Sequence, residues 1–222
     1  VEFILREGDI DNRTGGILDA EAMQMGGKIH RKIQRSMGAG YHAEVSMKKE
    51  IPCDGFCLKV EGRADGILEE ADVVTIDEIK GVLCELDEIK EPVGVHLAQA
   101  KCYAWMYAEQ RDLSFIGVQM TYCQMDTEEI KRFCYTYDCK ELKLWFDELI
   151  MKYEKWAKFQ VEWRRKRNAS AKGVQFPFSY RKGQKELAAS VYRTILRKKK
   201  LFIQAPTGVG KTEVSKALAE AV

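Results

Sequence analysis

The chain has 222 residues, of which 45% are hydrophobic and 32% are charged, and its net charge is +2 at pH 7. This composition is that of a globular protein, which excludes a disordered chain. No apolar run approaches the roughly 18 to 20 residues that a membrane span needs, and the first residues lack the pattern of a secretion signal. The sequence therefore predicts a cytoplasmic protein without a membrane partner.

Cysteine content and charge distribution narrow the class further. The seven cysteines are an odd number and none forms a C-x-x-C pair, so they are expected to be reduced thiols that pack as small hydrophobic side chains. Residues 61–91 contain 11 acidic and 3 basic side chains, whereas 181–200 contain 8 basic and 1 acidic. An acidic centre suits a cation, and a basic end suits phosphate.

Apolar periodicity and turn residues predict the elements in chain order. A three- to four-residue spacing of apolar side chains indicates an amphipathic helix over 18–37. Three β-prone runs follow, separated by Pro52, Asp54-Gly55 and Asp65-Gly66, which is the punctuation of an antiparallel meander. These three strands are expected at 44–49, 56–63 and 73–79.

Helices and strands continue to follow one another in the second half of the chain. A helix is predicted at 93–110, strands at 114–125 and 130–137, and a long charged helix at 140–167. A small, polar segment that begins at Asn168 predicts a linker. A basic helix over 183–198 and an apolar strand over 201–204 follow it. The expected order before the linker is helix, three strands, helix, two strands.

Two acids and a lysine end the third predicted strand, in the run Val74-Thr-Ile-Asp-Glu-Ile-Lys-Gly81. Because side chains alternate along a strand, Glu78 and Lys80 point to one side and Asp77 points to the other. Asp77 is therefore the disfavoured acid, expected to face outward in a structural role. An isolated D-E-x-K string is also what a solvated strand end with a local ion pair looks like.

Asp65, in Gly62-Arg-Ala-Asp65-Gly66, brings a second carboxylate to the predicted end of the neighbouring strand. Adjacent strands lie ~5 Å apart, so Asp65 and Glu78 are expected to share one divalent cation. Two carboxylates in an open site suit Mg²⁺ or Mn²⁺, which activates water and stabilises charge on phosphate. Lys80 would orient or help to deprotonate that water, or neutralise the phosphate.

Polar residues also occur on both predicted long helices. Gly26-Gly-Lys-Ile-His30 lies on the first helix, where a lone histidine is commonly a packed or surface residue. On the second helix Gln99 and Tyr103 are four residues apart and share one face, with His96 one turn earlier. This face can offer an amide and a phenol to phosphate or water, although the helix taken by itself favours a core role for Tyr103.

These features, in this order over residues 17 to 110, resemble the RecB-like nucleases of the PD-(D/E)xK superfamily. The resemblance implies an α/β fold with a restriction-endonuclease-like central mixed sheet flanked by helices. It implies His30, Asp65, Glu78 and the Ile79 carbonyl as metal ligands and Lys80 as the catalytic lysine, with Gln99 and Tyr103 matching the family's Gln-x-x-x-Tyr signature. Some members hold an iron-sulfur cluster on one upstream cysteine and a closely spaced downstream triplet, but among the downstream cysteines here only Cys134 and Cys139 are close together, so no cluster is expected.

A glycine-rich loop follows the apolar run Leu201-Phe-Ile-Gln204, and it reads A-x-x-x-x-G-K-T, with Ala205 in place of the first P-loop glycine. Backbone N–H groups from Gly208 through Gly210 to Lys211 would hold phosphates, Lys211 would reach the β and γ groups, and Thr212 would contact Mg²⁺. Together with Tyr180-Arg-Lys-Gly-Gln184, this segment resembles the start of the DinG and XPD-like DNA helicases. That resemblance implies Gln184 as a nucleotide-site contact.

Three domain segments are therefore expected: a nuclease domain at 1–167, a linker at 168–180 and the incomplete P-loop start of a helicase motor at 181–222. The chain begins at Val1 rather than at methionine and ends ten residues after Thr212, which suggests a fragment. Without the remaining motor motifs, it is expected neither to unwind DNA nor to hydrolyse ATP at a useful rate. ATP is a cofactor expected of the full-length protein.

The leading functional prediction is a Mg²⁺- or Mn²⁺-dependent deoxyribonuclease, with an exonuclease as the expected form, that acts on single-stranded or duplex DNA ends. It would be the nuclease module of a helicase-nuclease in DNA repair or recombination, with the rest of the helicase chain as its partner. One alternative is a non-catalytic DNA-binding module that loads DNA onto the helicase. Another is an ATPase or nucleotide kinase in which the P-loop is the function and the preceding domain is scaffold.

Overall fold

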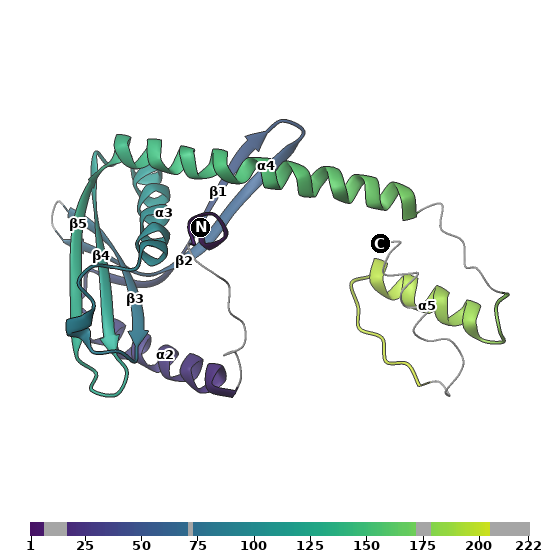
Figure 1. Ribbon diagram of the computed structural model, residues 1–222, viewed down its shortest axis with the longest axis horizontal. Helices are drawn as coiled ribbons and strands as arrows, with labels where there is room; N and C mark the ends of the chain where they lie inside the picture. The colour runs from purple at the N-terminus through teal and green to yellow at the C-terminus, as the bar shows by residue number, and fades with distance from the viewer. Residues whose placement is uncertain (7–16, 71–72, 172–178, 205–222) are drawn as a thin grey trace. The chain divides into compact units, whose positions relative to one another are not determined.

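The computed structural model describes residues 1–6, 17–70, 73–171 and 179–204 (Figure 1). Among the described residues, no helix is long and apolar enough to cross a membrane. The chain divides into two compact units, Val1–Trp156 and Ala157–Val222. The elements are α1 (Glu2–Leu5), α2 (Ile17–Ser36), β1 (Tyr41–Cys53), β2 (Phe56–Glu70), β3 (Val73–Val82), the 3-10 turn η1 (Leu86–Glu88), α3 (Gly94–Arg111), β4 (Phe115–Gln124), β5 (Ile130–Asp138), α4 (Cys139–Ala171) and α5 (Gln184–Leu196).

The first unit contains a five-stranded mixed sheet in the order β1-β2-β3-β4-β5. β3 and β4 are parallel, and the other neighbouring strands are antiparallel. A parallel pair needs a long crossover, and α3 supplies it here. The fold is therefore a mixed α/β fold with a sheet flanked by helices, which agrees with the α/β class predicted from the sequence.

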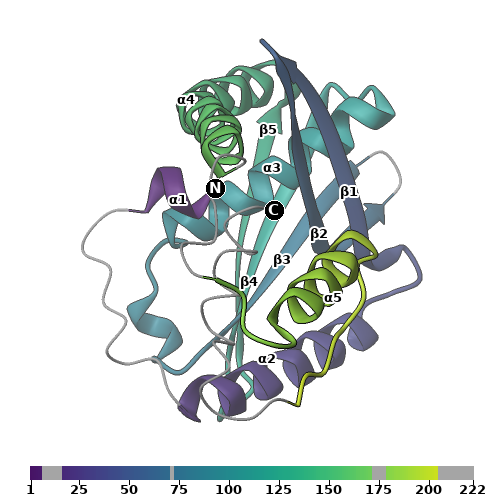
Figure 2. The same cartoon turned by 90° about the vertical axis from the view of Figure 1, so that its right-hand side faces the viewer.

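The sheet has a core on each face because the side chains of β3 alternate. Ile76 packs in a large cluster with α3 and with Leu142 and Phe146 of α4. Ile79 packs instead with Ile29 and Ile33 of α2. α1 lies beside α3 (Figures 1 and 2). Both faces of β3 are consequently covered, so a polar side chain on either face is shielded from water.

The first two strands are much longer than predicted, because residues expected to break them lie inside them. Pro52 belongs to β1, which is an edge strand, where the missing N–H of proline costs little. Asp65-Gly66 belongs to β2 rather than to a turn. Asp54-Gly55 is a turn, as predicted, and Gly55 has a positive φ of 79°.

Two predictions for the second half also need correction. α4 continues through Ala171, so residues 168–171 of the expected linker are helical, because the first helix breaker in that segment is Gly173. The run Leu201–Gln204 is not a strand; it pairs with no strand among the described residues, and a single strand is not stable without a partner. The segment from 205 to 222, which contains the whole P-loop, lies outside the described residues.

Candidate active site

The candidate site lies where β2 separates from β3. Their last paired residues are Gly66 and Asp77, and the part of β2 before Gly66 pairs with β1 alone. The β1–β2 ladder is itself interrupted at this level, because neither Glu44 nor Asp65 has a paired partner and Glu44 adopts a left-handed φ of 58°. This distortion frees both the backbone and the side chain of Asp65 from a regular ladder.

The carboxylate of Asp65 takes over a sheet hydrogen bond. Its Oδ2 accepts the backbone N–H of Ile79 at 2.8 Å, the next donor along β3 after the paired region ends. The carbonyl of Asp65 accepts Nε2 of Gln34 at 2.9 Å. Asp65 is thus fixed by β3 on one side and by α2 on the other.

His30 reaches the same carboxylate from α2. Its Nδ1 lies 3.3 Å from Oδ1 of Asp65, and both side chains are largely buried. The hydrogen bond to Asp65 raises the pKa of His30, against the opposing effect of burial. Gln34 follows His30 by four residues and so lies on the same face of α2. Sequence analysis missed Gln34, although this one-turn spacing from His30 is the signal that identifies it.

Glu78 is nearly inaccessible, with 1% exposure. Its Oε1 accepts a hydrogen bond from Lys80, but its buried Oε2 has no hydrogen-bond partner among the residues that the structure describes. Burial and the nearby charge of Asp65 raise the pKa of Glu78 to about 7, although Lys80 and His30 act in the opposite direction. Burying a carboxylate oxygen without a hydrogen-bond partner costs stability. The presence of such an oxygen here points to a ligand that binds it.

Lys80 connects β3 to the two polar residues of α3. Its Nζ lies 2.7 Å from Oε1 of Glu78 and 3.5 Å from Oε1 of Gln99. The amide of Gln99 in turn donates to the hydroxyl of Tyr103 at 3.3 Å. The helical spacing used in the prediction therefore places both α3 residues in one hydrogen-bonded row with Lys80. Tyr103 is also part of the core, so the two interpretations of this residue are compatible.

Asp77 does not face outward as predicted; it has 1% exposure because α2 and Tyr41 cover its side of the sheet. The prediction of a structural role fits its contacts. Its Oδ1 accepts Thr121 at 2.6 Å and Gln119 at 3.1 Å, and its Oδ2 accepts the Tyr41 hydroxyl at 2.9 Å. Both oxygens are therefore satisfied without a ligand.

The two glycines that flank this part of β2 each make room for a tyrosine. A Cβ at Gly62 would lie 2.6 Å from the hydroxyl of Tyr103, and a Cβ at Gly66 would overlap the hydroxyl of Tyr41. Gly62 therefore allows Tyr103 to approach Gln99, and Gly66 allows Tyr41 to reach Asp77. The sequence places these glycines around Asp65 but does not reveal which tyrosine side chains pack over them.

The donor set fits a hard divalent cation. Within the described residues, no group of three or more His, Cys, Asp and Glu side chains is placed to hold a metal ion. The charge of Asp65 nevertheless acts on Glu78, and the Oε2 of Glu78, which has no partner among the described residues, supplies a free lone pair. Carboxylate and backbone oxygens are the ligands that Mg²⁺ accepts, usually together with several waters.

The residues predicted to bind nucleotide belong to the second unit. Gly208, Gly210, Lys211 and Thr212 lie outside the described residues. Gln184 is the first residue of α5 and is 5% exposed. Its Oε1 accepts the backbone N–H of Arg181 at 2.7 Å, so this side chain closes the turn that starts the helix.

Comparison with protein-family models gives no match, and comparison with curated proteins gives none either. Solved structures do match, and one of them is described as "Crystal structure of SSO0001". That match has 20% sequence identity and a TM-score of 0.44, and it covers 60% of this chain. It spans 62% of that chain, which is less than two thirds of its length. The function is therefore inferred from the side chains of the site itself.

Proposed function

We propose that the first unit is a Mg²⁺- or Mn²⁺-dependent nuclease with a restriction-endonuclease-like fold, similar to the RecB-like nucleases, and that its substrate is DNA. The unpartnered, buried Oε2 of Glu78 carries this proposal. A binding surface needs no buried acid beside a lysine, because a carboxylate repels the phosphate that it would have to bind. Phosphodiester hydrolysis does need one, because the carboxylate holds the cation that neutralises the reacting phosphate.

Asp65, Glu78 and the carbonyl of Ile79 are the residues that would hold the cation, with His30 beside them. When bound, this cation would polarise the scissile phosphate and lower the pKa of an attacking water. Asp65 is held in place by the Ile79 N–H, so its free electron pairs are oriented before any ligand arrives. His30 must be neutral to serve as a ligand, and the hydrogen bond to Asp65 that raises its pKa favours the protonated ring and so competes with a cation.

Lys80 is placed to act on the phosphate and on the attacking water. Its ammonium is paired with Glu78, and this pair would loosen when Glu78 is engaged by a cation. Lys80 would then be free to hydrogen-bond a phosphate oxygen or the water. From α3, Gln99 restricts the position of the Lys80 ammonium by a hydrogen bond, and Tyr103 fixes the amide of Gln99 in the same way. Gln99 and Tyr103 are thus proposed as positioning residues.

The test uses Asp65→Asn and Lys80→Gln with linear single-stranded and duplex DNA and Mn²⁺ or Mg²⁺. Each substitution is expected to reduce cleavage about 10²- to 10³-fold, the usual effect of losing one group that stabilises transition-state charge. Lys48→Gln and Glu50→Gln are the matched controls, because Lys48 and Glu50 form an ion pair at the same two-residue spacing on β1 but are exposed. Controls that lose as much activity, or an inert wild-type protein, would contradict the proposal.

A second measurement separates the nuclease from a non-catalytic DNA-binding module. Isothermal titration with Mn²⁺ in the absence of DNA is expected to show binding to the wild type and weaker binding to Asp65→Asn. A binding module would retain DNA affinity in both proteins and take up no metal. This outcome would favour the alternative in which the unit only delivers DNA.

We further propose that the second unit belongs to an ATP-dependent DNA helicase motor, with Gly208, Gly210, Lys211 and Thr212 around the phosphates. The A-x-x-x-x-G-K-T spacing of the sequence supports this assignment. Repair or recombination would be the setting of such a helicase-nuclease. Equilibrium binding of a fluorescent ATP analogue by the wild type and by Lys211→Ala tests the assignment, and equal affinities would contradict it.

A further inference from the structure

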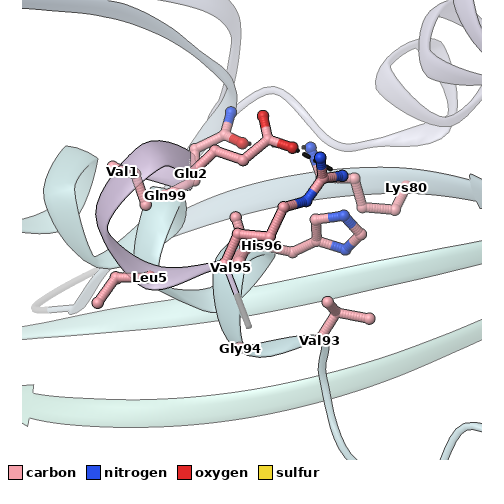
Figure 3. Close-up of a pocket in the computed structure, with 10 residues that line it drawn as sticks. Val1, Glu2, Leu5, Lys80, Val93, Gly94, Val95, His96 and Gln99 are labelled. Carbon is pink, nitrogen blue, oxygen red and sulfur yellow. Dashed lines mark hydrogen bonds and ion pairs between the residues drawn. The ribbon is translucent and has the colours of Figure 1, made fainter. Parts of the chain in front are cut away.

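A cavity of about 710 Å³ opens directly beside Lys80. Its size lies within the roughly 300 to 1,000 Å³ that is usual for small-molecule sites. Lys80, His96 and Gln99 line it from β3 and α3, and Glu2 and Leu5 line it from α1 (Figure 3). Because Lys80 and Gln99 belong to both the candidate active site and this cavity, the two spaces are continuous.

The charges around the cavity favour an anion. Arg6 and Lys80 are cationic, and Glu2 is the one carboxylate among the described lining residues. Glu2 is already bound to Arg6 at 3.0 Å, and the two side chains are 62% and 54% exposed. An exposed pair of this kind contributes little, so a more highly charged anion can take the place of Glu2 on Arg6. The guanidinium then offers two parallel N–H donors, which match the geometry of a phosphate.

His96 adds a neutral donor. Burial and the charge of Lys80 lower the pKa of His96, which favours the uncharged ring. Its Nδ1 lies 3.3 Å from the Tyr122 hydroxyl, which already accepts the Val93 N–H at 3.0 Å. When the Tyr122 hydroxyl donates its own hydrogen to Nδ1, the histidine hydrogen lies on Nε2 and is available to a ligand. The first turn of α3, with Gly94 and Val95, borders the same cavity.

We propose that this cavity binds a terminal phosphate monoester of the DNA strand whose next linkage is cut beside Lys80. This inference rests on the proposed nuclease function and names its substrate class more closely. A monoester carries a charge of about −1.5 to −2 at pH 7, compared with −1 for each internal phosphodiester, so the guanidinium of Arg6 selects a strand end while Lys80 serves the linkage that is cut. The resulting enzyme is an exonuclease that recognises phosphorylated ends, with Arg6 and His96 as specificity-determining residues.

Fluorescence anisotropy in EDTA measures this selectivity without cleavage. Three labelled oligonucleotides of one sequence are compared, with a 5′-phosphate, a 3′-phosphate or hydroxyl groups at both ends. Wild-type protein is expected to bind one of the phosphorylated strands about tenfold more tightly than the hydroxyl strand, the effect of one charged hydrogen-bonding group. Which phosphorylated strand is preferred gives the polarity of the enzyme. Equal affinities for all three strands would overturn the inference.

Two variants of Arg6 connect the selectivity to the cavity. Arg6→Gln is expected to abolish the preference for the phosphorylated end, and Arg6→Lys to retain part of it because a point charge replaces the two-pronged guanidinium. Lys48→Gln, an exposed cation of β1 outside the cavity lining, is the control and is expected to keep the full preference. Thermal unfolding of each variant establishes that it is folded. A folded Arg6→Gln protein with undiminished preference would overturn the inference.

Cleavage with Mn²⁺ distinguishes this inference from the function on which it rests. Digestion of linear DNA without any dependence on end phosphates would overturn the cavity assignment and leave the nuclease intact. Selective binding of phosphorylated ends without cleavage would support the cavity and remove the nuclease. Faster digestion of one phosphorylated strand than of the strand with hydroxyl groups at both ends supports both.

Discussion

Asp77 and Glu78 are neighbouring acids on β3, each with 1% exposure, but their surroundings differ in kind. On the α2 side of the sheet, both oxygens of Asp77 are satisfied by donors from β1 and β4, so this carboxylate links strands on either side of β3. On the α3 side, Glu78 is bonded to Lys80 through one oxygen, and its other oxygen has no partner in the described part of the chain.

This difference separates stability from function at one dipeptide. A buried acid whose oxygens all accept hydrogen bonds helps to hold the fold together. A buried acid with an unpartnered oxygen lowers the stability of the fold. Only a ligand that binds this oxygen offsets the loss. The four predictions below follow from this comparison between the two sides of β3.

The largest expected effect is on catalysis by Glu78→Gln. We expect DNA cleavage with Mn²⁺ to fall about 10³-fold, because the amide cannot supply the negative oxygen that a cation requires. Stability should be unchanged or higher, since a buried charge has been removed. Single-turnover cleavage rates and urea unfolding of the same preparations check both halves. A variant that is inactive because it is unfolded would not support the comparison.

Asp77→Ala is expected to have the opposite profile. It leaves the donors of Tyr41, Gln119 and Thr121 buried without an acceptor, which costs about 4 kcal/mol of unfolding free energy. Urea unfolding with fluorescence detection measures this loss. Thr121→Val removes one donor and serves as the graded control, with a smaller loss. Wild-type stability in Asp77→Ala would show that Asp77 is not the structural acid.

The pH dependence of stability in EDTA should show the cost of the Glu78 charge. Its pKa is raised from the ordinary 4.5 to about 7, so between these values the folded state keeps a proton that the unfolded state has lost. The contribution of Glu78 to stability is therefore full below pH 4.5 and is lost as the pH rises to about 7, by about 3 kcal/mol. The difference between wild type and Glu78→Gln, measured by urea unfolding at several pH values, should show this loss. A difference that is flat with pH would contradict the assignment.

Gly62→Ala and Gly66→Ala extend the comparison to the tyrosines. On the Asp77 side, Gly66→Ala should lower the unfolding free energy by about 2 kcal/mol, because its methyl group would displace the side chain of Tyr41 from its position over Gly66. On the Glu78 side, the methyl group of Gly62→Ala would displace Tyr103 and thereby Gln99. We expect this variant to lose a larger share of its cleavage rate than Gly66→Ala does. Urea unfolding and cleavage rates, measured for both variants, show which variant loses stability and which loses activity.

Local patterns predicted the order of the elements and the side-chain direction of Glu78 and Lys80. Period-two alternation places these two side chains together regardless of what surrounds the strand, and a four-residue helical spacing does the same for Gln99 and Tyr103. The structure brings these residues into one hydrogen-bonded row. These features depend on the backbone geometry of one element, which the sequence determines directly.

Features that depend on contacts between distant elements were not predicted. Asp77 was expected to face outward because nothing in its own strand indicates that α2 covers the opposite face. The interruption of β2 at Asp65 was interpreted as a turn, because the left-handed Glu44 and the separation from β3 are properties of three strands together. The sequence places His96 one turn before Gln99, but the cavity that it lines together with Arg6 depends on tertiary contacts.

The hydrogen bond from the Ile79 N–H to Asp65 has a consequence for spectroscopy. This amide lies at the end of the β2–β3 ladder and is bonded to a carboxylate of the proposed metal site rather than to a carbonyl. Its proton chemical shift and its exchange rate with solvent deuterium therefore depend on the charge and position of Asp65. We expect the Ile79 amide signal to follow proton and cation occupancy of the site directly, without an attached chromophore and without DNA.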